Sequence, residues 1–219
     1  MLLLATDTSG KDGSIALARC GPNSCDILDV VPLEGGTFSA QLVPQISATL
    51  LKHGFSKDDL GGFCVASGPG SFTGLRVGLA AIKALAEILG KPIAAVSLLE
   101  AVAVAASSSE PILAVLDAGR GEVYVGEYEN VKLGAERLLT FEELLSEARS
   151  TAVATPDASV AAKLKAQGIS VQEIPRQRAD AIARMGWQKI QAGHTVTPED
   201  LEANYIRRSD AEIFSKPRA

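Results

Sequence analysis

The chain has 219 residues and a formal net charge of −5, and 47% of its residues are hydrophobic. This length is enough to bury a sizeable core in one large domain or two small ones, and the composition is that of a globular protein. The acidic balance argues against a protein that grips nucleic acid alone over a broad basic face.

The opening residues "MLLLATDTSG" lack the basic and long apolar regions of a signal peptide. No apolar run in the sequence is long enough to span a bilayer. We therefore expect a cytoplasmic protein that has no membrane partner.

Cysteine and histidine give little support for a metal site. Cys20, Cys25 and Cys64 make an odd count without a CxxC spacing, and Cys64 lies in the apolar run "GGFCVASG", where a small core residue is expected. His53 and His194 lie far apart in the sequence. We therefore expect no structural zinc site.

The first half of the chain alternates strands and helices. Short apolar runs predict four strands, at 2–6, 14–20, 61–68 and 91–97. The turn-rich "SGKDG" joins the first two strands as a hairpin. Helical spacing of apolar residues predicts three helices, over 39–53, up to Gly90 and over 98–107. This alternation indicates an α/β fold.

A composition break at "SSSEP" (107–111) precedes a repeat of the opening theme. "LLLATDTSGKDGSIALARC" and "ILAVLDAGRGEVYVGEYE" both run from an apolar strand through an aspartate and a glycine-containing turn into a second strand. The two aspartates are Asp7 and Asp117. Further patterns predict a helix near 141–149, a strand-turn-helix unit over 154–168 and a helix near 179–192. We therefore predict two related α/β domains, 1–106 and 107–219, the second with less regular structure.

Asp7 and Asp117 each end a buried strand beside a turn of small residues. Facing each other across a cleft, such carboxylates can organise Mg²⁺ or a phosphate-bound water, while hairpin N–H groups hold the phosphate. Those N–H groups would come from Thr8, Ser9, Gly119 and Gly121. Alternatively, each aspartate caps its own hairpin turn. The spacing alone leaves both interpretations open.

The stretch "ASGPGSFTGLRVGLAAIKALAEILG" (66–90) begins with a glycine-rich turn and becomes a long apolar helix. It has neither the lysine of a Walker loop nor the glycine spacing of a dinucleotide fingerprint, which favours a helix start over a phosphate cradle. The helix is apolar over most of its circumference, and Gly74 and Gly78 form a face that a second backbone can approach closely. That face is covered either within this chain or by a partner protein.

Several stretches resemble the TsaB family, also called YeaZ, a bacterial component of the machinery that makes N6-threonylcarbamoyladenosine (t6A) in tRNA. They are "LLATDTSGKDGSIAL", "ASGPGSFTGLRVGLAAIKALA", "PIAAVSLLEAVA" and "LAVLDAGRGEVYVGEY", and the likeness returns in the tail at "ANYIRRSDA". The resemblance spans residues 2–128 and is weakest over 130–200. It implies an actin-like ATPase (ASKHA) fold of two RNase H-like halves, the second of them reduced.

The resemblance also implies partners: the catalytic paralogue TsaD in a heterodimer, and the ATPase TsaE, with tRNA reached only through the complex. In the family, the helices matching 39–53 and the "GPGSFTG" helix meet a similar pair on TsaD in a four-helix bundle. A similar surface can self-associate into a homodimer. The interface residues expected in this chain are Leu42, Ile46, Phe72, Gly74, Leu75, Arg76, Gly78, Leu79 and Ile82.

The resemblance further implies a non-catalytic subunit. TsaD carries a metal-binding histidine pair, whereas the matching positions here are Leu98 and Val102, which cannot ligate a metal. Many family members have a histidine near the start of the first helix, where this chain has Phe38. We expect no cofactor in the isolated chain, with ATP or ADP possible in the complex.

Two other functions are weighed against this one. An independent ATPase or phosphotransferase would use Asp7 and Asp117 around Mg-ATP, but the late turn "ATPDAS" lacks the Gly-Gly expected of an adenosine site. A peptidase is disfavoured because the sequence offers no Ser-His-Asp or histidine–metal arrangement.

Overall fold

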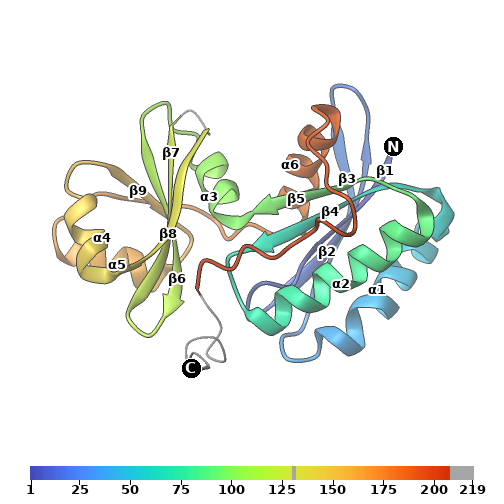
Figure 1. Ribbon diagram of the computed structural model, residues 1–219, viewed down its shortest axis with the longest axis horizontal. Helices are drawn as coiled ribbons and strands as arrows, with labels where there is room; N and C mark the ends of the chain where they lie inside the picture. Colours follow the sequence, from blue (N-terminus) through green and yellow to red (C-terminus); the bar gives the residue numbers. More distant parts are fainter. Residues whose placement is uncertain (130–131, 208–219) are drawn as a thin grey trace, which may run out of the picture.

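The computed structural model describes residues 1–129 and 132–207, which form two lobes side by side (Figure 1). Each lobe is built on a five-stranded sheet, with the order β3-β2-β1-β4-β5 in the first and β10-β9-β6-β7-β8 in the second. The two orders are the same, since β6 to β10 take the places of β1 to β5. This is the strand order of an RNase H-like unit, and its presence in both lobes confirms the predicted repeat.

The strands of the first lobe are β1 (Leu2–Asp7), β2 (Gly13–Cys20), β3 (Cys25–Leu33), β4 (Leu60–Gly68) and β5 (Ile93–Ser97). Those of the second are β6 (Ile112–Gly119), β7 (Glu122–Glu129), β8 (Lys132–Thr140), β9 (Ala152–Thr155) and β10 (Val171–Glu173). In each lobe the first three strands form an antiparallel meander, and the last two run parallel to the first.

Three helices occupy matching places in the chain order of each lobe. They are α1 (Phe38–Lys52), α2 (Phe72–Leu89) and α3 (Leu98–Ala106), then α4 (Phe141–Glu147), α5 (Ala158–Ala166) and α6 (Ala179–Gln191), with a 3-10 turn at Lys57–Asp59. α4 and α5 have 7 and 9 residues, against 15 and 18 in α1 and α2. The second lobe is therefore reduced in its helices, while its sheet has the same number of strands.

The lobes exchange their third helices. α3 packs mainly on β6 and β7 of the second sheet, whereas α6 packs across β1, β2, β4 and β5 of the first (Figure 1). The backbone N–H of Ala179 donates to Ser14 Oγ at 3.0 Å, and Trp187 Nε1 donates to the Gly21 carbonyl oxygen at 2.9 Å. The predicted boundary between residues 106 and 107 thus falls between the two sheets but does not separate the lobes, because each half of the chain lends a helix to the other.

α1 and α2 cover the outer face of the first sheet. Their apolar stripes enter one core with β1, β2 and β4. α2 begins as predicted at the glycine-rich turn, where the Ser71 hydroxyl oxygen accepts from the Gly74 N–H at 3.3 Å, and it ends at Gly90, whose φ of 61° is left-handed.

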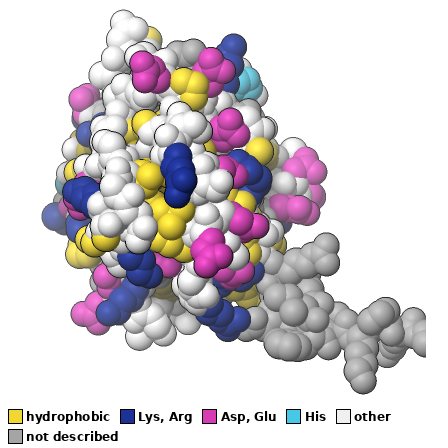
Figure 2. All heavy atoms as spheres, turned by 90° about the vertical axis from the view of Figure 1, so that its left-hand side faces the viewer, with side chains coloured by type: hydrophobic (Ala, Val, Ile, Leu, Met, Phe, Trp, Pro, Cys, Tyr) yellow, Lys and Arg dark blue, Asp and Glu magenta, His cyan; other side chains and the backbone are white. Residues whose placement is uncertain are grey.

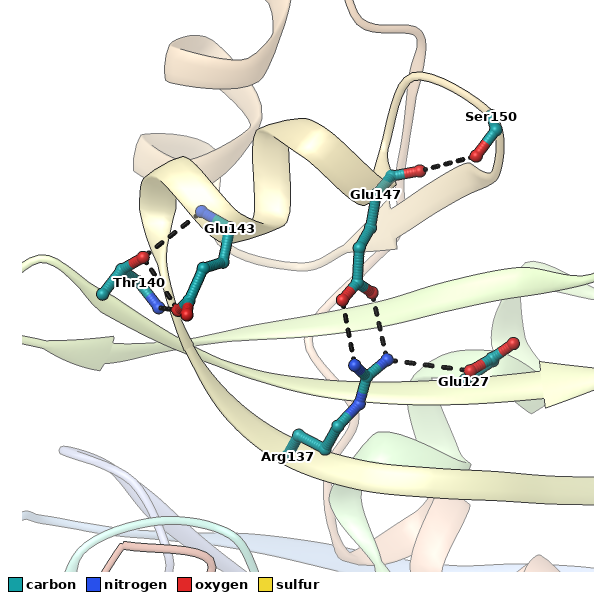
Figure 3. A network of polar contacts seen from close by, with 6 residues as sticks. All are labelled: Glu127, Arg137, Thr140, Glu143, Glu147 and Ser150. Atoms are coloured by element: carbon teal, nitrogen blue, oxygen red, sulfur yellow. Dashed lines mark hydrogen bonds and ion pairs between the residues drawn. The ribbon is translucent and has the colours of Figure 1, made fainter.

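Polar contacts hold the short helix α4 against the second sheet (Figure 3). Thr140 and Glu143 form a capping box: the Glu143 N–H donates to Thr140 Oγ1 at 3.2 Å, and the Thr140 N–H donates to the Glu143 carboxylate at 2.7 Å. At the far end, the Arg137 guanidinium donates twice to Glu147, at 2.9 and 3.0 Å. These contacts stabilise a helix that would be too short to persist alone.

Cys20 and Cys25 face each other across the β2–β3 hairpin and form a disulfide, a pairing that the sequence analysis did not predict. Cys64 is buried in the core, as expected, and burial raises the pKa of its thiol to about 12. His53 Nε2 lies 3.0 Å from an Asp29 carboxylate oxygen. Within residues 1–129 and 132–207, no three His, Cys, Asp or Glu side chains gather where they could hold a metal ion.

A search for membrane-spanning helices over the described part of the chain found none that is both long and apolar enough.

Candidate functional site

A cleft of about 550 Å³ lies between the two hairpins that carry the predicted aspartates. Ser9 to Asp12, in the β1–β2 turn, line one side of it, and Asp117 to Gly119, at the end of β6, line the other. Leu98 and Arg176 are also among its lining residues. The structure therefore brings together the two turns that the sequence repeat singled out.

Asp7 is buried, and its carboxylate is engaged within its own turn. Oδ1 accepts from the Ser9 N–H at 2.9 Å and from the Ser9 hydroxyl at 2.6 Å. Burial raises the pKa of Asp7, and the two bonds from Ser9 and the charge of Arg176 act in the opposite direction. This geometry is that of an aspartate that caps a turn.

Asp117 repeats this geometry in the second lobe. Its Oδ1 accepts from the Gly119 N–H at 2.7 Å, and its own N–H donates to Asp157 Oδ2 at 2.8 Å. Gly119 and Gly121 have φ values of 72° and 81°, which other residues adopt only at a cost. Both aspartates therefore cap their hairpin turns, which is the second of the two interpretations that the sequence left open.

Thr8 fastens the glycine face of α2 to the end of β1. Its hydroxyl donates to the Gly74 carbonyl oxygen at 2.7 Å. A Cβ on Gly74 would lie 2.0 Å from the Thr8 carbonyl oxygen, and one on Gly78 would lie 2.4 Å from Thr8 Oγ1. The Ser71 N–H, in the glycine-rich turn, donates to the Ser9 carbonyl oxygen at 2.7 Å. The close approach that the glycines allow is thus made within the chain.

This packing corrects the expected partner interface. Its buried members, which cannot present a surface to another protein in this conformation, are Leu42, Ile46, Gly74, Leu75, Gly78, Leu79 and Ile82. Phe72 and Arg76 remain more accessible, and the Arg76 guanidinium lies 3.7 Å from the centre of the Phe72 ring. Helical spacing identified the apolar face of each helix, but that face contacts the chain's own sheet.

The opposite face of α1 and α2 carries exposed apolar side chains. Val43 is 59% exposed, Leu51 79% and Ile88 74%, and Ala80 and Ala84 of α2 are exposed as well. We call these five residues the outer helical face. Sequence reasoning missed them, although Val43 and Leu51 are apolar residues that stand outside the buried stripe of their helix.

Arg176 and Asp157 were also missed. The Arg176 guanidinium pairs with Asp157, the carboxylate that holds the Asp117 N–H. The pair ties the segment before α6 to the end of β6, and the charge of Arg176 partly offsets the rise that burial causes in the pKa of Asp7. The sequence did contain a signal for Asp157, since it stands at the start of a predicted helix. Asp157 is the N-cap residue of α5, but its side chain makes no capping hydrogen bond to that helix.

Apolar side chains occupy the three positions that the family resemblance matches to histidines in other family members, which are Leu98, Val102 and Phe38. Leu98 and Val102 are 9% and 1% exposed, and they line a small cavity of about 60 Å³ with Asp7 and Arg176. Phe38 is buried, and its ring lies against Gly13. None of these three side chains has a donor atom for a metal.

We expect Asp7→Asn to keep the fold and to raise its stability at neutral pH. The amide Oδ1 can accept the same two hydrogen bonds from Ser9, and the substitution removes a buried charge. Because folding raises the pKa of Asp7, its carboxylate costs stability once the pH has risen above the unfolded value of 3.8, and the cost is absent below that value.

Urea denaturation at neutral pH and at about pH 3.5 measures this difference. The variant should be more stable than the native chain at neutral pH, and the gap should close in acid. A variant that is less stable at neutral pH would show that the turn needs the charged carboxylate.

A protein-family model described as TsaD, tRNA N6-adenosine threonylcarbamoyltransferase, matches residues 30–206. The tRNA threonylcarbamoyladenosine biosynthesis protein TsaB of Bacillus subtilis is 35% identical over 130 residues, which cover 59% of this chain and 56% of that protein. TsaB of Escherichia coli is 32% identical over 137 residues, which cover 61% and 58%. The matched region thus spans less than two thirds of the length of these relatives.

Two solved structures from Pseudomonas aeruginosa share the fold. One is YeaZ, with a TM-score of 0.73 and 22% identity over 93% of this chain and 99% of that one. The other is described as an uncharacterized protein with similarity to peptidase YEAZ, with a TM-score of 0.74 and 24% identity over 94% and 99%. At these identities the likeness shows the fold, which agrees with the two RNase H-like halves.

Proposed function

We propose that this chain, as a member of the TsaB (YeaZ) family within the group matched by the TsaD model, takes part in tRNA t6A biosynthesis. Its proposed role is that of a non-catalytic subunit. Its partners are the catalytic paralogue TsaD and the ATPase TsaE, and it meets tRNA only through their complex. The cleft supports this proposal: Asp7 is bound within its own turn, and apolar Leu98 and Val102 occupy the positions that the family resemblance matches to the histidine pair of TsaD.

The outer helical face is the proposed docking surface for TsaD. Large apolar side chains at this exposure are typical of interaction sites when they gather on one face. The small residues Ala80 and Ala84 leave room for a second helix to approach α2. A matching pair of apolar helices fits such a face, which is the geometry of a four-helix bundle, and a second copy of the chain would fit it when TsaD is absent.

The far end of the second lobe has a different character. Figure 2 shows acidic and basic side chains intermixed there, with apolar side chains exposed between them. Lys163, for example, lies 5.7 Å from the centre of the Phe141 ring. A mixed surface of this kind is ordinary for a solvated face, so the apolar partner is assigned to α1 and α2.

In this proposal the isolated chain requires neither a metal nor a nucleotide. ATP or ADP is bound only when the complex with the partner proteins has formed. The proposed location is the cytoplasm, where tRNA and the two partner proteins are available.

Reconstitution tests the function. The chain, TsaD and TsaE are combined with tRNA, ATP and an activated threonylcarbamoyl donor, and t6A is measured with each protein left out in turn. We expect t6A to form only when this chain is present, and Asp7→Asn to support it as well as the native sequence. Undiminished t6A without the chain would refute the proposal.

The rate of ATP hydrolysis by the isolated chain distinguishes this proposal from the alternative of an independent ATPase or phosphotransferase. We expect no turnover above that of Asp7→Asn. Enzyme-like turnover that Asp7→Asn abolishes would instead establish Asp7 as a catalytic carboxylate.

A further inference from the structure

The segment from Val196 to Arg207 crosses from the first lobe to the second (Figure 1, red). It starts at the edge of the first sheet, where the Val196 N–H donates to the Ile93 carbonyl oxygen at 2.9 Å. Leu201 is 1% exposed within the core beneath α1 and α2. We call this segment the strap, and its two ends are bound to different lobes.

Asn204 is bound to both lobes at once. Its backbone N–H donates to the Ser67 carbonyl oxygen of β4 at 2.7 Å, and its side-chain Nδ2 donates to Glu136 Oε2 of β8. The other oxygen of Glu136 accepts from the Ser97 hydroxyl at 2.6 Å and from the Tyr128 hydroxyl at 2.7 Å. The Glu136 carboxylate therefore joins the end of β5, the second sheet and the strap.

Arg207 fixes the end of the strap to the end of the β6–β7 hairpin. Its guanidinium donates to the Ala118 carbonyl oxygen at 2.8 Å and to that of Gly119 at 3.3 Å, and it pairs with the Glu122 carboxylate. This end of the hairpin is the second-lobe wall of the cleft. A shift of that wall relative to the first lobe would have to break or carry along these bonds.

We propose that the strap is an interlobe clamp that fixes the width of the cleft through the Asn204–Glu136 and Arg207–Glu122 contacts. The exchanged helices α3 and α6 join the two lobes through a shared apolar core, and contacts across the cleft further limit how the lobes can move relative to each other. Here charge-assisted hydrogen bonds, which are stronger than neutral ones, span the two lobes on one side of the cleft. The clamp concerns the freedom of the isolated chain, so it stands apart from the proposed function.

The test measures the distance between lobes by pulsed electron paramagnetic resonance, with spin labels on cysteines introduced at the exposed positions Glu87 of α2 and Ser159 of α5. The chain without these two cysteines provides the blank. The native strap should give one narrow distribution of distances. Asn204→Asp places a second carboxylate against Glu136, and the distribution should broaden and shift as the two repel.

A compensating substitution makes the test specific. In Asn204→Asp combined with Glu136→Gln, the new amide nitrogen replaces Oε2 and donates to the new carboxylate. The remaining oxygen still accepts from Ser97 and Tyr128, as Oε1 does in the native chain. The narrow distribution should therefore return in the double variant.

Tyr205→Phe is the matched control in the strap, because it removes only the hydroxyl that accepts from Arg76 Nε at 3.2 Å, a contact that joins the strap to α2 of the first lobe and not to the second lobe. It should leave the distribution narrow. Arg207→Ala should also broaden the distribution, because it removes the contacts of the strap with the β6–β7 hairpin. If circular dichroism shows that Asn204→Asp does not fold, Arg207→Ala alone tests the clamp. A narrow distribution in folded Arg207→Ala and Asn204→Asp, or no recovery in the double variant, would overturn the clamp.

Discussion

Gly74→Leu and Gly78→Val are expected to lower the free energy of unfolding severely. At Gly74 the first side-chain atom would lie 2.0 Å from the Thr8 carbonyl oxygen, which is backbone and cannot rotate away. At Gly78 it would lie 2.4 Å from Thr8 Oγ1, the atom whose hydroxyl holds α2 to β1. Overpacking in a rigid core costs about 1–3 kcal/mol and occasionally more, and we expect about 3 kcal/mol or more for Gly74→Leu.

If Gly74 and Gly78 instead faced a partner, as the interface implied by the family resemblance would have it, both variants would stay folded and lose only affinity for that partner. Denaturant midpoints measure the effect, and Ala84→Leu is the matched control because it puts a leucine at an exposed position of the same helix. The control should change stability by about 0.5 kcal/mol or less. Native-like stability of Gly74→Leu would mean that α2 does not pack on Thr8.

Leu51→Glu and Ile88→Glu are expected to leave the fold intact and to abolish tight binding to TsaD. Both side chains are more than two-thirds exposed, at 79% and 74%, so a carboxylate there stays hydrated in the free chain. In the proposed helix bundle the same carboxylate would be buried without a partner, which is costly. We expect a loss of about 2 kcal/mol or more for each substitution, or roughly 30-fold in Kd.

Titration calorimetry against TsaD measures this loss, and sedimentation of the isolated variants reports on self-association through the same face. Ser159→Glu on α5 is the control, since it places the same charge on an exposed helix of the other lobe. It should bind as the native chain does. Native affinity in folded Leu51→Glu and Ile88→Glu proteins would place the interface elsewhere on the molecule.

The sequence by itself determined the repeat and the class of fold. The two Asp-bearing hairpins around Asp7 and Asp117 stood out because buried strands in sequence have continuous apolar runs, and those runs end at polar turns. The edge strands Cys25–Leu33 and Lys132–Thr140 escaped notice because most of their described residues are half-buried or exposed, which weakens the apolar signal. The motifs of the TsaB family were likewise visible without coordinates.

Only the tertiary structure decided which surfaces meet. Helical spacing shows that a face of α2 is apolar, but it does not say whether the chain or a partner covers that face. The answer lies in contacts between distant residues, such as Thr8 with Gly74, 66 positions apart, and Asn204 with Glu136, 68 positions apart. The exchange of α3 and α6 could not be predicted for the same reason. Which sheet a helix packs on depends on the path of the chain in space, and local periodicity does not contain that information.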